Sequence, residues 1–222
     1  MLDASALAHV FAATAERRRA VADLLETLDE SQLAAPSLCA GWDVRTVGAH
    51  LAQTAAPGAL GEFLRDVVRA RGSIHRANDA AARRAGRRPV ARTVALLRER
   101  AESRFSPPMT GPRAPLTDLL VHEGDMRLPL GLDHGPEPAQ VRVGLDFVTS
   151  GRAIGFVPRG RLRGLRLAAA DLDWSWGDGL DVTGRGIDLL MAACGRAAVL
   201  PRLDGAGLPV LAARHDVGDA AG

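Results

Sequence analysis

An aspartate and two histidines have the residue types and the spacing of a metal site. Asp118 and His122 are four residues apart, and His50 lies far upstream. If both stretches are helices, residues four apart differ by about 40° around the axis, so Asp118 and His122 share one face. A second helix would supply the other imidazole. Three such ligands with a fourth position left open are typical of a catalytic zinc site rather than a structural one.

A structural interpretation of the same residues remains open. A buried carboxylate is costly unless it is paired, protonated or bound to a metal. Asp118 and His122 could therefore form a buried hydrogen bond that only fixes helix packing. A lone histidine such as His50 is more often a hydrogen-bonded core residue than a ligand. The residues alone do not decide between packing and metal binding.

The composition limits the kinds of partner. The chain has 222 residues, of which 47% are hydrophobic, and its formal net charge is +2. That charge is too small to indicate a nucleic-acid partner. All 28 basic residues are arginine, and there is no lysine or tyrosine. Because lysine and tyrosine codons are AT-rich, the composition suggests a high-GC genome, as in many actinobacteria.

Targeting signals and cysteine spacing give a cytoplasmic expectation. The N-terminus has no signal-peptide pattern, and no segment reaches the roughly 18 apolar residues of a membrane span. The two cysteines, Cys39 and Cys194, have no metal or redox spacing relative to each other. We expect a cytoplasmic protein with reduced thiols and no membrane partner. The oligomeric state is left open.

Hydrophobic periodicity predicts an α+β protein with a helical first domain over 1–134. Asp43 is a suitable N-cap for the helix that carries His50, and Trp42 is expected to pack at the entrance of that helix. The other predicted helices of this domain cover 3–28, 60–85, 90–104, and a segment around Asp118–His122 that ends near Pro129.

The pattern changes after residue 135, where short apolar runs alternate with glycine and aspartate turns. This predicts a small α/β domain over 136–222. Its expected helices cover 139–150 and 187–193, and its expected strands cover 162–168, 171–176, 180–183 and 208–213.

Two segments carry a resemblance to a known family. They are Leu38-Cys-Ala-Gly-Trp-Asp-Val-Arg-Thr-Val-Gly-Ala-His-Leu-Ala52 and Asp118-Leu-Leu-Val-His-Glu-Gly-Asp-Met-Arg127. Both resemble the mycothiol-dependent maleylpyruvate isomerase family, and the likeness extends more weakly to 181–190 and 194–196. The resemblance implies a DinB-like four-helix bundle followed by a small domain similar to sterol carrier protein 2.

The resemblance also implies a site. The family's metal ligands are a histidine and a Glu-x-x-x-His pair, which correspond to His50, Asp118 and His122. Asp118 is one methylene shorter than the family's glutamate, so its helix must lie closer to the ion or the site is weakened. Asp125 is expected to orient His122 or to pair with Arg127. Related enzymes use a C-terminal arginine, and we name Arg214 for that role, with Arg196 as the other candidate.

The implied chemistry uses zinc, or another divalent metal, and mycothiol, the low-molecular-weight thiol of actinobacteria. An open metal position can hold the cofactor sulfur as a thiolate at neutral pH, ready to attack an electrophilic small molecule. Departure of the thiol after rotation gives cis–trans isomerisation, and release of the adduct gives S-transfer, the wider category, which we rank slightly higher. The alternatives are a metal-dependent hydrolase of the same superfamily and a non-catalytic binding protein with a decayed metal site. No cofactor-binding residue can be named.

Overall fold

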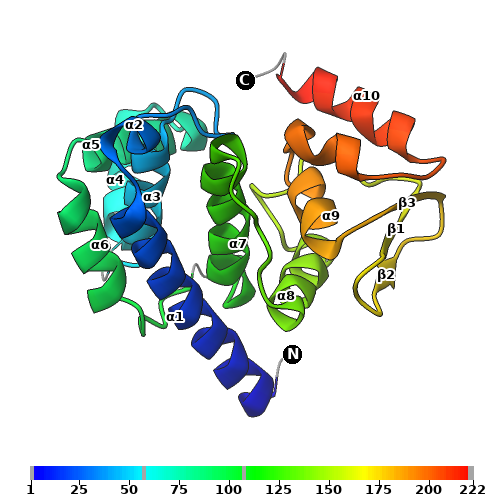
Figure 1. Ribbon diagram of the computed structural model, residues 1–222, viewed down its shortest axis with the longest axis horizontal. Helices are drawn as coiled ribbons and strands as arrows, with labels where there is room; N and C mark the ends of the chain where they lie inside the picture. Colours follow the sequence, from blue (N-terminus) through cyan, green and yellow to red (C-terminus); the bar gives the residue numbers. More distant parts are fainter. Residues whose placement is uncertain (1–2, 57–58, 107–108, 220–222) are drawn as a thin grey trace. The chain divides into compact units, whose positions relative to one another are not determined.

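The computed structural model describes residues 3–56, 59–106 and 109–219. Figure 1 shows a mainly helical chain with one small sheet. The contacts divide it into two compact units, the first made of residues 1–107 and 122–134 and the second of 108–121 and 135–222. The predicted α+β class is confirmed. The domains predicted over 1–134 and 136–222 stay a prediction.

Helices make up the first unit. They are α1 (Ala4–Thr27), α2 (Glu30–Leu33), α3 (Val44–Thr54), α4 (Ala59–Arg69), α5 (Ile74–Gly86), α6 (Val90–Glu99), and the C-terminal part of α7 (Arg113–Arg127), which continues into the 3₁₀ turn Leu128–Leu130. Helix α1 packs along α6, and α3 packs against α5, α6 and α1 (Figure 1).

Helix α3 begins where the sequence predicts. The side chain of Asp43 accepts a hydrogen bond from the backbone N–H of Thr46, which satisfies one of the unpaired donors of the first turn. Val44, Val47 and Leu51 are fully buried or nearly so. These apolar side chains recur at helical spacing and anchor α3, so the position of His50 on its last turns follows from the packing of the helix.

The prediction of one continuous helix over 60–85 is wrong. The structure has two helices there, α4 and α5, separated by a turn in which Arg71 and Gly72 both have positive φ. Two successive left-handed residues end a right-handed helix. Ser73 then caps α5 through the N–H of Arg76, so the glycine and serine supply the stop and start signals.

The second unit contains the small sheet. Its elements are α8 (Pro138–Val148), β1 (Leu165–Ala169), β2 (Ser175–Trp176), β3 (Leu180–Gly184), α9 (Gly186–Ala193), the 3₁₀ segment Ala197–Arg202 and α10 (Leu208–Asp219). The strand order is β2-β1-β3, with β1 antiparallel to β2 and parallel to β3. Helix α9 packs against β1 and β3 and also contacts α8.

The prediction of a last strand over 208–213 is also wrong, because this segment begins α10. Over 208–215, where the side chains of α10 are described, the buried positions are Leu211 and His215, four residues apart, which is the spacing of a helical face. Pro209 is tolerated because it lies in the first turn, where an N–H has no partner within the helix. Among the described residues, no helix combines the length and the apolar character needed to cross a membrane.

A close approach of α5 to α3 generates a stability prediction. A Cβ added at Gly86 would lie 2.7 Å from the Thr46 hydroxyl oxygen and 3.2 Å from the Thr46 Cα. Because the Cα cannot move without the helix, Gly86→Ala should lower the free energy of unfolding, measured by urea denaturation. Overpacking costs about 1–3 kcal/mol, and the helical preference of alanine recovers up to about 1 kcal/mol of it.

Gly61→Ala is the matched control. Gly61 lies in α4, and a Cβ there would meet nothing within 4 Å. Its stability should be unchanged or slightly raised. Equal stability of the two variants would show that the α3–α5 contact is looser than described.

Candidate metal centre

The two histidines predicted as ligands lie side by side. His50 comes from α3 and His122 from α7, and their ring centroids are 5.1 Å apart with the planes nearly perpendicular. Both side chains are partly exposed. The tertiary structure therefore joins two imidazoles that are 72 residues apart in the sequence, and it leaves them accessible to a solute.

Asp118 completes the predicted set. It lies one turn before His122 on the same unbroken helix, so the geometry of α7 fixes the spacing of the two side chains. Ligand atoms of His50, Asp118 and His122 all lie within 4.8 Å of one another. Zinc bonds of about 2.0–2.2 Å place the donors of a tetrahedral site about 3.3–3.6 Å apart. Side-chain rotation can close that difference, so the donor set fits a divalent ion.

Asp125 holds the ring of His122. Its Oδ2 lies 2.9 Å from His122 Nδ1, and its side chain is fully buried. A carboxylate on one ring nitrogen fixes the tautomer and leaves the other nitrogen, Nε2, for a metal. Arg127, the other expected partner of Asp125, forms a 2.8 Å ion pair with Glu123, and its pairing with Asp125 stays a prediction.

Cys39 also belongs to this centre, and sequence reasoning missed it. Its Sγ lies 3.1 Å from Asp125 Oδ2 and 3.4 Å from His122 Nδ1. Cys39, His122 and Asp125 thus form a second group whose ligand atoms lie within 4.8 Å of one another. The spacing between the two cysteines did not indicate a site, because Cys39 contacts a histidine and an aspartate and not the other cysteine. The relevant signal was its place in the loop before the His50 helix.

Trp42 lines the same centre. Its ring lies 5.3 Å from that of His50 and 6.4 Å from that of His122. Its indole N–H donates a 2.8 Å hydrogen bond to Asp79 Oδ1, and Arg83 binds the same carboxylate. The packing role predicted for Trp42 is therefore incomplete, because its ring also lies beside the two imidazoles.

Backbone hydrogen bonds fix the loop that carries Cys39 and Trp42. The N–H of Leu38 donates to the carbonyl of Asp125 at 3.1 Å, which attaches the loop to α7. The N–H of Trp42 donates to the carbonyl of Cys39, and the N–H of Ser37 donates to the carbonyl of Trp42. Loop and helix are thus joined through main-chain hydrogen bonds, which fix the backbone at Cys39 relative to α7.

The arginines proposed for the site lie in the second unit. Arg214 Nη1 donates to the carbonyl of Arg161 at 2.7 Å, and Arg161 Nη1 lies 2.9 Å from His215 Nδ1. Arg196 Nη1 donates to the carbonyl of Cys194. These contacts do not test a catalytic role, so that of Arg214 stays a prediction.

Comparison with known proteins supports the resemblance. Residues 14–117, just under half of the chain, match the model of the mycothiol maleylpyruvate isomerase N-terminal domain. That segment contains His50 and ends immediately before Asp118. No curated protein matches the chain significantly.

A solved structure has the same fold. The crystal structure of a mutant of a mycothiol-dependent maleylpyruvate isomerase matches with a TM-score of 0.60 at 13% identity, covering 90% of this chain and 92% of that one. This match supports an α+β fold with a helical N-terminal bundle. At 13% identity, the match is evidence for a similar fold and not for a function.

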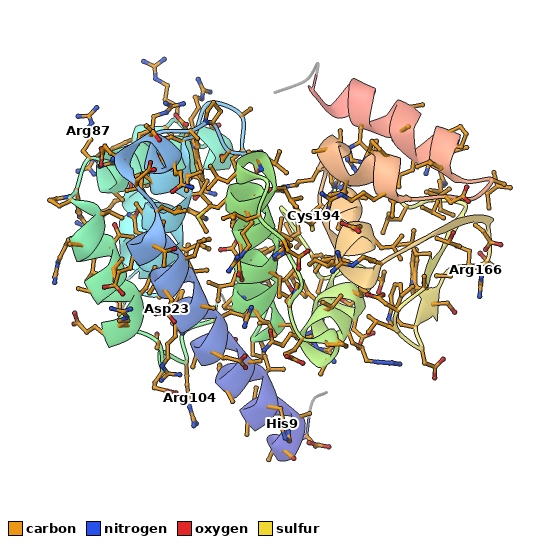
Figure 2. The ribbon with its side chains drawn as sticks, in the orientation of Figure 1. His9, Asp23, Arg87, Arg104, Arg166 and Cys194 are labelled. Carbon is orange, nitrogen blue, oxygen red and sulfur yellow. The ribbon has the colours of Figure 1, made fainter. Side chains whose placement is uncertain are left out.

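Removal of His122 should abolish divalent metal binding, because its ring belongs to both groups of potential ligands. We expect the affinity of His122→Ala for Zn²⁺ to fall more than about 100-fold, since losing even an outer partner of a ligand typically costs 10–100-fold. Isothermal titration of metal-free protein measures this. His9→Ala is the control, because His9 is an exposed residue near the start of α1 (Figure 2). Full metal occupancy in His122→Ala would remove this residue from the ligand set.

Proposed function

Because the chain carries the N-terminal domain of the mycothiol maleylpyruvate isomerase family, we propose that it is a zinc-dependent enzyme that uses mycothiol as cosubstrate. Its reaction is S-transfer to, or cis–trans isomerisation of, an electrophilic small molecule. The observation that supports this most directly is the convergence of His50, Asp118 and His122 from two helices. Their donor atoms suit a divalent ion and leave a coordination position open.

The donor set also fits the expected chemistry. When bound by these three residues, zinc supplies a positive charge that lowers the pKa of a coordinated thiol and keeps it as a thiolate at neutral pH. The residues of the chain bind the ion, orient its ligands and shape the space beside it. The shorter side chain of Asp118 is compatible with this role, because its carboxylate lies within 4.8 Å of both histidine donors.

Asp125 is the orienting residue of the proposal. Being fully buried, it loses its hydration and depends on hydrogen bonds such as that with His122 Nδ1. With the proton on Nδ1, this bond would leave Nε2 to bind the ion. Trp42 lies beside both imidazole rings and forms one side of the centre. Arg214 is included from the resemblance alone, and unchanged turnover in Arg214→Gln would remove it.

Cobalt spectroscopy tests the cofactor. Mycothiol added to the cobalt-substituted Cys39→Ser variant should produce a sulfur-to-cobalt charge-transfer band, because the substitution removes the thiol nearest the centre. The band should be absent in Cys39→Ser/His50→Ala, which lacks one ligand of the open site. S-alkylated mycothiol is the matched control and should give no band.

Two outcomes favour the alternatives. A metal-loaded protein that gives no band with mycothiol would favour a hydrolase, in which the open position serves water. Failure to retain stoichiometric metal after zinc supplementation would favour a binding protein with a decayed site. If the band appears, a screen of electrophiles with product masses separates the two reactions, since S-transfer adds the mass of the thiol and isomerisation leaves the substrate mass unchanged.

A further inference from the structure

We propose that Cys39, Asp125 and His122 form a second metal-binding position, one that contains a protein thiolate and competes with the first position for His122. The ligand of this position is a thiophilic divalent ion such as Zn²⁺, Co²⁺ or Cd²⁺. The proposal concerns metal binding by the protein alone. It does not depend on mycothiol or on the proposed reaction.

The spacing of the three donors is close to that of a metal site. The distances are 3.1 Å from Sγ to Oδ2, 3.4 Å from Sγ to Nδ1 and 2.9 Å from Nδ1 to Oδ2. In a tetrahedral site, bonds of about 2.3 Å to sulfur and 2.0–2.2 Å to nitrogen and oxygen give separations of about 3.3–3.6 Å between nitrogen and oxygen and about 3.5–3.7 Å from sulfur to either. Each pair therefore needs to separate by about 0.1–0.7 Å for an ion to enter between them.

The position is held by the main chain. Leu38, which precedes the thiol, donates its N–H to the carbonyl of Asp125, and the carbonyl of Cys39 accepts from the N–H of Trp42. Asp125 and His122 are three residues apart on α7. One donor thus comes from a loop attached to that helix and two from the helix itself. Cys39 and His122 are partly exposed, so an ion can reach the site.

Charge and ligand chemistry select the ion. Binding releases the proton of the Cys39 thiol, and the resulting thiolate and the Asp125 carboxylate together balance the two positive charges of the ion. A thiolate favours Zn²⁺ and Cd²⁺ over Mg²⁺ and Ca²⁺, which prefer oxygen ligands. The first position, with two imidazoles and a carboxylate, has no protein sulfur. The two positions therefore differ in a property that spectroscopy detects directly.

His122 makes the two positions mutually exclusive. A neutral imidazole has one nitrogen with a free lone pair and one that carries a proton. The hydrogen bond to Asp125 places that proton on Nδ1 and leaves Nε2 for the first position. An ion bound to Nδ1 moves the proton to Nε2, which can then no longer bind the first ion. We therefore expect one equivalent of metal per chain and not two.

Cobalt titration of metal-free protein, with no added thiol, tests the proposal. The wild type should develop a sulfur-to-cobalt charge-transfer band, and Cys39→Ser should lose it. Cys194→Ser is the matched control and should keep the band, because Cys194 is a buried residue at the C-terminal end of α9, in the second unit (Figure 2). In the His50→Ala background, which lacks a ligand of the first position, the affinity for Cd²⁺ should fall more than about 100-fold on adding Cys39→Ser and stay unchanged on adding Cys194→Ser.

His50→Ala separates this proposal from the proposed function. The variant lacks a ligand of the first position only, so the thiol-free band should persist or strengthen. Because the first position can hold the ion in the wild type, His50→Ala is the decisive variant. Cobalt binding without a charge-transfer band in His50→Ala would overturn the second position and leave the mycothiol reaction intact. A band that persists in Cys39→Ser would likewise overturn it. Circular dichroism confirms that each variant is folded.

Discussion

The centre depends on one buried carboxylate. Asp125 is fully buried, and its side chain contacts both the ring of His122 and the thiol of Cys39. Its main-chain carbonyl also accepts the hydrogen bond that attaches the loop before α3 to α7. A carboxylate taken out of water is costly unless such bonds replace its hydration. The same requirement therefore holds the ring of His122, the thiol of Cys39 and the loop before α3 in place.

The position of α3 is the second constraint. Gly86 of α5 allows the backbone of Thr46 to approach closely, and Gly48 makes a similar contact with Leu25 of α1. These small residues let α3 pack tightly between its neighbours, with His50 on its last turns. The packed helix and the loop attached to α7 together bring the two imidazoles side by side. Rigid helices hold such ligands more accurately than loops do.

The proposed functions place two kinds of sulfur chemistry in one small volume. The set of His50, Asp118 and His122 is proposed to hold an ion with a position open to an external thiol, while Cys39 places a protein thiol beside the same His122. A single imidazole cannot serve two ions as a neutral ligand. In these proposals, the hydrogen bond between Asp125 and Nδ1 of His122 favours the position that binds Nε2. Loss of that bond favours the position that binds Nδ1.

The sequence by itself determined the local features. Helical spacing on α7 gave the Asp118–His122 pair, an aspartate before an apolar run gave the cap of α3, and the short apolar runs gave the three strands of the sheet. It was misleading in segments where apolar content was ambiguous, since 208–213 fits a strand as well as the first turns of a helix. The break between α4 and α5 was missed although Gly72 and Ser73 signalled it.

Only the tertiary structure decided which distant residues meet. It placed His50 beside His122, Cys39 beside Asp125, and Trp42 beside the two imidazoles. These contacts join segments separated by tens of residues, and the hydrophobic periodicity of the sequence does not predict them. Local sequence patterns predict the hydrogen bonds and the buried face of a single helix. The meeting of residues from different helices depends on how those helices pack together.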